Sequence, residues 1–197
     1  MSAPTVLIVP GLRDHVARHW QTLLEARLRT AGRPVAGVPP LGRDDLACDT
    51  RVAAIEQAAQ AIGGPIVLVA HSGGCVMLAH WAVRTQRPVQ AALLAAPPDF
   101  DRPLPEAYPT LAALRTGGWL PVPRTRLPFP SIVAASRNDP LADYDRVAAL
   151  ARDWGSRLVD LGEVGHLNPA SGFGEWPQAL AFVDALTSAA ARQAALN

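Results

Sequence analysis

Residues 65–74 read PIVLVAHSGG, and this stretch decides the fold class. Residues 66–70 are apolar at every position, which is typical of a strand buried on both faces of a parallel sheet. The apolar, Ala-rich stretch over 74–87 follows after only a few residues and predicts a helix. A buried strand that turns directly into a helix indicates an α/β architecture.

The same alternation continues in both directions along the chain. Short apolar runs predict five more strands, at 5–10, 33–38, 89–95, 131–135 and 157–161. Stretches with helical spacing of apolar residues predict helices around 20–28, 52–62, 147–154 and 176–192. The expected fold is a compact three-layer α/β sandwich with about six mainly parallel strands and helices on both faces. Ligands of such sheets bind at the carboxyl ends of the strands, so we expect the chemistry directly after a strand.

Composition narrows the class of protein further. The 197 residues fit a single domain over 1–197, and 49% hydrophobic residues argue against a disordered chain. A net charge of +1 without a basic stripe gives no reason to expect a nucleic-acid partner. No apolar run approaches the length of a membrane span, and the first residues lack the features of a signal peptide. We therefore expect a cytoplasmic protein without a membrane partner.

Residues 97–130 interrupt the rhythm of strands and helices. This segment contains nine prolines and has room for only one short helix, around 111–115. Connections of this length are usually functional or disordered. We interpret 97–130 as a Pro-rich loop or small lid that forms a pocket wall, which leaves no large cap domain. A surface insertion without a role is the alternative.

The turn after the 65–70 strand is a candidate nucleophile elbow. In the pattern small-x-Ser-x-Gly, a sharp strand-to-helix turn exposes the hydroxyl of Ser72, and its neighbours at Ala70 and Gly74 must be small to avoid collision. Gly73 and Gly74 could instead belong to a phosphate-binding loop. The chain has no GxGxxG pattern, however, and without any lysine it cannot form GxxxxGK[ST].

A serine nucleophile needs a general base and a group that orients it. His166 follows the last predicted strand, and its late position fits the chain order serine, acid, histidine of α/β hydrolases. The predicted acid is Asp139, directly after the 131–135 strand, although Asn138-Asp139-Pro140 is also a common turn sequence. Asp99 is the alternative acid.

The other polar residues near the predicted edge have weaker claims. Asp143 and Asp145 are expected to begin the next helix. His19 is expected to pack beside the site, and His15 lies in the loop after the first strand.

The oxyanion hole requires two backbone donors. One is the N–H of Gly73, directly after the nucleophile, and the other is expected from the loop after the first strand. By position we assign the N–H of Leu12, with that of Arg13 as the alternative.

The chain resembles a small serine-hydrolase family that includes retinoblastoma-binding protein 9 and bacterial YdeN-like proteins. The most specific mark is the closing run GHLNPASGFGEWP at 165–177. Further marks are Val9-Pro10-Gly11-Leu12, His19-Trp20-Gln21, Val69-Ala70-His71-Ser72, Arg137-Asn138-Asp139-Pro140 and Trp154-Gly155. The resemblance implies a compact α/β-hydrolase fold and a triad of Ser72, Asp139 and His166.

Two departures from the family pattern lie in the oxyanion region. Similar bacterial proteins often carry Leu after the nucleophile, where this chain has Gly73, and a small Ser-Gly stretch where it has Asp14-His15-Val16. The retinoblastoma-binding motif LxCxE is also incomplete, because residues 46–50 read LACDT. That binding function is therefore not expected here.

The predicted function is hydrolysis of small carboxylic esters or related acyl substrates by a serine hydrolase. The two cysteines, Cys48 and Cys75, form no CxxC pair, so no metal cluster is expected, and the chemistry needs no cofactor. Two alternatives remain: a non-catalytic binding or regulatory protein on a hydrolase scaffold, and an amide or peptide hydrolase with the same triad. Either a monomer or a small homo-oligomer is compatible with the sequence.

Overall fold

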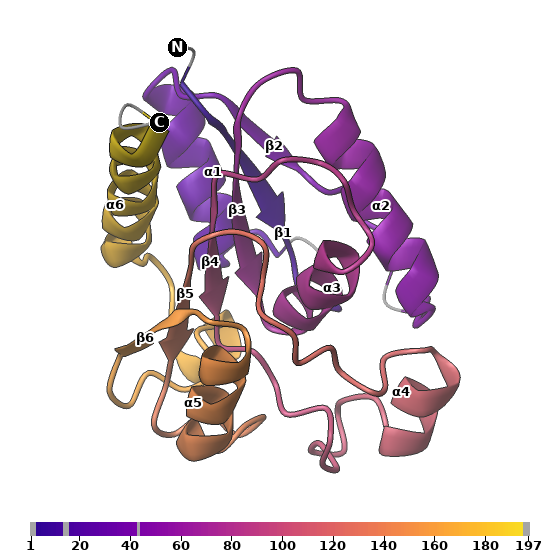
Figure 1. Ribbon diagram of the computed structural model, residues 1–197. Helices are drawn as coiled ribbons and strands as arrows, with labels where there is room; N and C mark the ends of the chain where they lie inside the picture. The colour runs from indigo at the N-terminus through magenta and orange to yellow at the C-terminus, as the bar shows by residue number, and fades with distance from the viewer. Residues whose placement is uncertain (1–2, 14–15, 43, 195–197) are drawn as a thin grey trace.

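The computed structural model describes residues 3–13, 16–42 and 44–194. Its centre is a six-stranded sheet with the order β2-β1-β3-β4-β5-β6, in which every neighbouring pair is parallel. The strands are β1 (Thr5–Val9), β2 (Val35–Gly37), β3 (Ile66–His71), β4 (Ala91–Ala95), β5 (Ser131–Ala135) and β6 (Arg157–Asp160). In Figure 1 the strands run downward, so their carboxyl ends lie at the lower edge.

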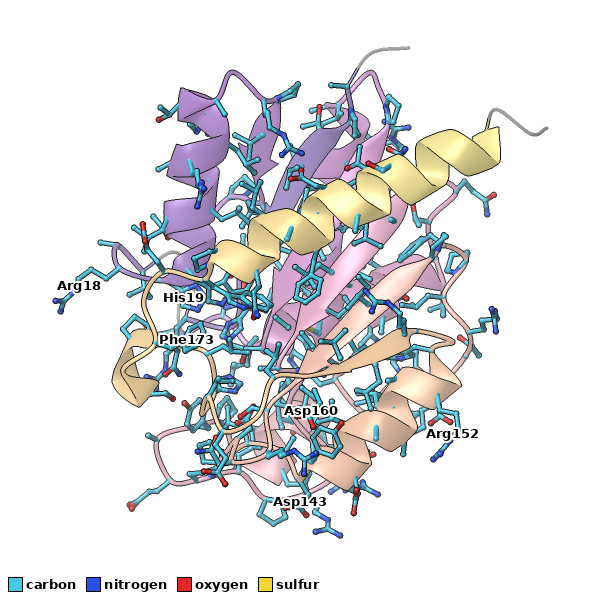
Figure 2. All side chains as sticks on the ribbon, turned by 90° about the vertical axis from the view of Figure 1, so that its left-hand side faces the viewer. Arg18, His19, Asp143, Arg152, Asp160 and Phe173 are labelled. Atoms are coloured by element: carbon cyan, nitrogen blue, oxygen red, sulfur yellow. The ribbon has the colours of Figure 1, made fainter. Side chains whose placement is uncertain are left out.

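Helices cover both faces of this sheet, and each face has its own hydrophobic core. Successive strand residues alternate between the two cores: Leu7 and Leu68 belong to one, Ile8 and Val69 to the other. On one side lie α1 (Trp20–Thr30) and α6 (Pro177–Ala194); on the other lie α2 (Cys48–Gln60), α3 (Gly73–Ala82) and α5 (Tyr144–Asp153) (Figure 1). Figure 2 shows α6 crossing the sheet face diagonally. The predicted three-layer α/β architecture is confirmed. Within the described residues, no helix is both long and apolar enough to cross a membrane.

Helix α3 ends at Ala82, whereas the sequence predicted a longer helix that ends at Arg87. The residues after it bond to α2 and the loop that follows α2. The hydroxyl of Thr85 donates a hydrogen bond to Glu56 at 2.8 Å, and the Arg87 guanidinium donates to the carbonyls of Ile62 and Gly64 at 2.6 Å. These side-chain bonds replace another helical turn and tie the end of α3 to α2.

The Pro-rich segment 97–130 packs against the helices rather than projecting from them. From β4 it runs to α4 (Leu111–Thr116) and returns past α3 and α5 to the start of β5 (Figure 1). The Trp119 indole is fully buried and donates a hydrogen bond to the Leu46 carbonyl at 2.7 Å. His80 on α3 donates from Nε2 to the Trp119 carbonyl at 3.0 Å. Other buried side chains of the segment are Phe100, Leu114, Val122, Leu127 and Phe129.

Candidate active site

Ser72 lies at the turn between β3 and α3, in a strained backbone conformation. Its φ of 55° and ψ of −133° fall where residues other than glycine are rarely found. Gly74 makes this turn compatible with the sheet, since a Cβ there would lie 2.6 Å from the Pro10 carbonyl oxygen and 2.7 Å from that of Val9. The start of α3 therefore presses directly on the end of β1, and the predicted elbow geometry is present at Ser72.

The structure brings Ser72, Asp139 and His166 together at the carboxyl edge of the sheet. The Ser72 Oγ lies 2.8 Å from His166 Nε2, and His166 Nδ1 lies 2.8 Å and 3.0 Å from the two Asp139 carboxylate oxygens. The side chains of His166 and Asp139 are only 3% and 2% exposed. Because an ionised carboxylate only accepts hydrogen bonds, Nδ1 carries a proton. Nε2 of the neutral ring then accepts a hydrogen bond from the Ser72 hydroxyl.

The loop that carries His166 is fixed by side chains on both sides of it. Gly165 donates its N–H to the Asn138 side chain at 2.7 Å, and His166 donates its N–H to the Ser171 hydroxyl at 3.0 Å. Leu167 has a φ of 50°, so the backbone is also strained directly after the histidine. These bonds give part of the 165–177 run a physical reason: Gly165 and Ser171 help to fix the backbone that carries His166.

His71 contributes a contact that the sequence did not reveal. Its Nε2 lies 2.9 Å from the His166 carbonyl, which can only accept, so Nε2–H donates. Burial, followed by the charges that His166 and His19 carry when protonated, lowers the pKa of His71 well below its ordinary value. His71 therefore stays neutral and braces the backbone of His166 from the end of β3. Its place as the last residue of a buried strand was the only signal in the sequence.

The alternative acid, Asp99, is engaged elsewhere. Its carboxylate accepts hydrogen bonds from Arg146 at 2.7 Å and 3.2 Å, and it makes no contact with His166. Burial is the largest single influence and opposes ionisation of Asp99, but the Arg146 hydrogen bonds, the Asp101 N–H and the charges of Arg146 and Arg102 together lower its pKa. Asp143 is the N-cap of α5 and Asp145 lies in its first turn, as the sequence indicated.

The other candidate histidines and the nearby cysteine have separate positions. His19 is the N-cap of α1 and accepts a hydrogen bond from the Gln21 N–H at 3.2 Å. Burial raises the pKa of the Cys75 thiol, so this residue remains a neutral core side chain. Asp14 and His15 lie outside the described residues.

The first loop lies directly against the nucleophile. A Cβ at Gly11 would lie 3.1 Å from the Ser72 Cβ, and a Cβ at Gly73 would lie 2.8 Å from the Leu12 Cγ. The Leu12 side chain thus fills the space that a side chain at position 73 would need. This packing accounts for glycine at position 73, and it places Leu12 and Gly73 side by side next to Ser72.

A cavity of about 590 Å³ opens over Ser72 and His166. Its polar lining includes His19, His71 and Asn168, and its wall on the side of the Pro-rich segment is formed by Pro98, Phe100, Leu104, Ala107, Tyr108 and Pro109. Trp119, which is fully buried, is not part of this lining. In the described part of the chain, no three His, Cys, Asp or Glu side chains are placed to share a metal ion.

Known proteins resemble this chain in sequence and in fold. A family model described as serine hydrolase matches residues 6–185. A protein described as a YdeN-like hydrolase from Pectobacterium atrosepticum is 27% identical with a TM-score of 0.79, covering 94% of this chain and 91% of that chain.

Two further structures share the fold at lower identity. The ydeN gene product of B. subtilis is 18% identical with a TM-score of 0.75, covering 94% of this chain and 99% of its own. Est1E from Butyrivibrio proteoclasticus, solved with ferulic acid bound, is 14% identical with a TM-score of 0.69, covering 98% and 90%. Among curated protein sequences, none matches this chain significantly.

Proposed function

Because this chain belongs to the serine hydrolase family, we propose that it is a carboxylesterase-type enzyme that cleaves small carboxylic esters through an acyl-enzyme on Ser72. One observation carries the proposal. An unbroken hydrogen-bonded line runs from Ser72 Oγ through both ring nitrogens of His166 to the Asp139 carboxylate, with each step at 2.8 Å. This arrangement can deprotonate the serine as it attacks a carbonyl carbon.

In the acylation step, Ser72 Oγ forms a bond to the ester carbonyl carbon while His166 Nε2 takes the hydroxyl proton. Asp139 stabilises the resulting imidazolium through the Nδ1–H bond. The carbonyl oxygen becomes negatively charged, and we assign the Gly73 and Leu12 N–H groups to hold it. Gly73 is the first residue of α3, so its N–H has no acceptor within the helix.

The tetrahedral intermediate then breaks the bond to the leaving alcohol, and His166 gives its proton to that oxygen. In the second half, water attacks the acyl-enzyme, His166 accepts the water proton, and the carboxylic acid leaves as Ser72 recovers its hydrogen. This scheme uses only side chains and backbone groups of the chain, without a metal or cofactor.

The surroundings of Ser72 support a small-molecule substrate. A cavity of about 590 Å³ is within the usual range for small-ligand sites. Residues 98–109 form one wall of it, and their packing on buried side chains of 97–130 supports a fixed pocket wall within one domain. An apolar wall on this scale suits the hydrocarbon part of an ester.

Intact mass after treatment with a fluorophosphonate probe tests the nucleophile. We expect one covalent adduct on the wild type and none on Ser72→Ala, with Cys75→Ala as a control that still reacts. Labelling of Ser72→Ala, or no labelling of the wild type, contradicts the assignment. A matched panel of p-nitrophenyl esters and p-nitroanilides then tests the substrate class, and amide turnover equal to ester turnover would overturn the esterase proposal.

A further inference from the structure

The charge distribution around the cavity indicates which esters it takes. Most of its lining is apolar, and the described lining residues include no aspartate or glutamate. Among the polar side chains deep in the site, His71 is held neutral by burial, which lowers its pKa. Arg13 is the single formally charged side chain among the described lining residues. Apart from the Ser72, Asp139 and His166 side chains, Arg13 is therefore the most strongly polar group that a substrate contacts.

Two contacts hold the Arg13 side chain across the mouth of the cavity. Its guanidinium carbon lies 4.8 Å from the centre of the Tyr108 ring, and its Nη2 donates a hydrogen bond to the Ala107 carbonyl at 3.2 Å. Both partners belong to the Pro-rich wall, so the Arg13 side chain joins the first loop to that wall. One of five N–H donors is used in this way, and the guanidinium is positioned by contacts that do not neutralise it.

Several other arginines of the chain form ion pairs with carboxylates. Arg84, Arg124 and Arg137 each form an ion pair with at least one aspartate. Within the residues that the structure describes, no carboxylate lies at ion-pair distance from Arg13. A positioned cation beside an apolar cavity, without an anionic partner among the described residues, is suited to a carboxylate brought by the ligand, because the arginine fork matches carboxylate geometry.

We propose that the preferred substrate is an ester whose apolar body carries a carboxylate, and that Arg13 binds this group at the cavity mouth. The inference rests on the proposed esterase function and adds a substrate class to it. The carboxylate is bound rather than transformed, so the reaction at Ser72 stays the same. Arg13 then acts as a specificity-determining residue. Its substitution leaves the backbone N–H groups beside Ser72 in place.

Two pairs of substrates test this proposal. The first pair is the mono-p-nitrophenyl ester of adipic acid and its terminal carboxamide, which differ in charge at the far end of the acyl group. The second pair is 4-acetoxybenzoate and 4-acetoxybenzamide, which differ in charge on the leaving group. We expect kcat/KM to favour the carboxylate by about two- to fivefold in at least one pair, the size typical of a water-accessible ion pair. Added salt should reduce this preference.

Variants assign the preference to Arg13. Arg13→Gln should bring the carboxylate-to-carboxamide ratio close to one, and Arg13→Lys should retain part of it as a point charge. Arg18→Gln is the matched control, because Arg18 is exposed, does not line the cavity and points away from the molecule (Figure 2). It removes the same charge and should keep the wild-type ratio.

The outcomes separate this proposal from the one it rests on. If wild type and Arg13→Gln hydrolyse both members of each pair with unchanged ratios, the carboxylate proposal is wrong and the esterase proposal stands. If Arg18→Gln lowers the ratio as much as Arg13→Gln, net charge rather than a site explains the preference, and the proposal is again overturned. Failure of the wild type to hydrolyse any ester or to react with fluorophosphonate defeats the esterase proposal itself.

Discussion

The carboxylate of Asp139 fixes both the tautomer and the orientation of the His166 ring, since it accepts from Nδ1 at 2.8 Å and 3.0 Å. Asp139→Asn would place an amide there, which can donate to Nδ1 and leave the proton on the wrong nitrogen. We expect kcat on p-nitrophenyl acetate to fall by about 10⁴-fold, as in other serine triads. Asp145→Asn, an exposed residue in the first turn of α5, should keep its activity.

His71 makes the stability of the fold depend on pH. Its pKa is lowered in the folded protein, so as pH falls below its ordinary value the unfolded chain gains a proton that the folded protein does not. The free energy of unfolding should therefore decrease from pH 7 to 5.5, with a limiting slope of about 1.4 kcal/mol per pH unit from this residue. Urea titrations at several pH values measure it.

A glutamine at position 71 keeps a donor for the His166 carbonyl but does not titrate. His71→Gln should flatten the pH dependence between 5.5 and 7. His80→Gln should flatten it less, because His80 is less deeply desolvated, although its pKa is also lowered by burial. Parallel stability profiles for the wild type and His71→Gln would contradict a buried neutral histidine.

Among the elements, the contact of α3 with β1 leaves no room for a side chain at Gly74. A Cβ there would lie 2.6 Å from the Pro10 carbonyl oxygen, so Gly74→Ala has to push the helix away from the strand. We expect a loss of about 1–3 kcal/mol in unfolding free energy and a larger fractional loss of probe labelling. Gly63→Ala, with nothing within 4 Å of its added Cβ, is the control. Equal effects of the two variants on stability and labelling would show that the close approach is unimportant.

Trp119 is one of the buried side chains that attach the Pro-rich segment to the helices. Truncating this fully buried side chain leaves a cavity beside α3 and removes the bond to the Leu46 carbonyl. Trp119→Ala should cost about 3–5 kcal/mol, measured by urea unfolding. Val83→Ala, at a side chain that is 54% exposed, should change little. A small loss for Trp119→Ala would indicate that the segment is not held by this contact.

For the whole molecule, the sequence predicted the architecture because its signals are local. The apolar runs of β3 and β5 are continuous and bounded by turn residues. Their length and burial can therefore be predicted without knowing which strands pair with them. The chain order of Ser72, Asp139 and His166 was equally readable, because each follows a strand and all strands end at one edge. The bounds of α3 were less predictable, since Thr85 and Arg87 bond to α2 and to the loop after it, more than 20 residues away.

The contacts that the sequence did not reveal all join distant segments. The bond from His71 to the His166 carbonyl spans 95 positions, and Arg13 meets Ala107 across 94. The Leu12 side chain fills the space beside Gly73, and this packing depends on how closely the first loop approaches the start of α3. No periodicity or spacing along the chain encodes such contacts, because they follow from the order of strands in the sheet.

That strand order has a kinetic consequence. The residues around Ser72 come from the ends of β1, β3, β5 and the loop after β6, so the cluster is complete only when β6 pairs with β5. Helices can form earlier, because their hydrogen bonds join residues that are close in sequence, whereas each strand pairing joins residues far apart. During refolding from urea, reaction of Ser72 with fluorophosphonate should therefore lag behind the recovery of the helical circular dichroism signal. Labelling of Ser72 would then report when the residues around it have come together.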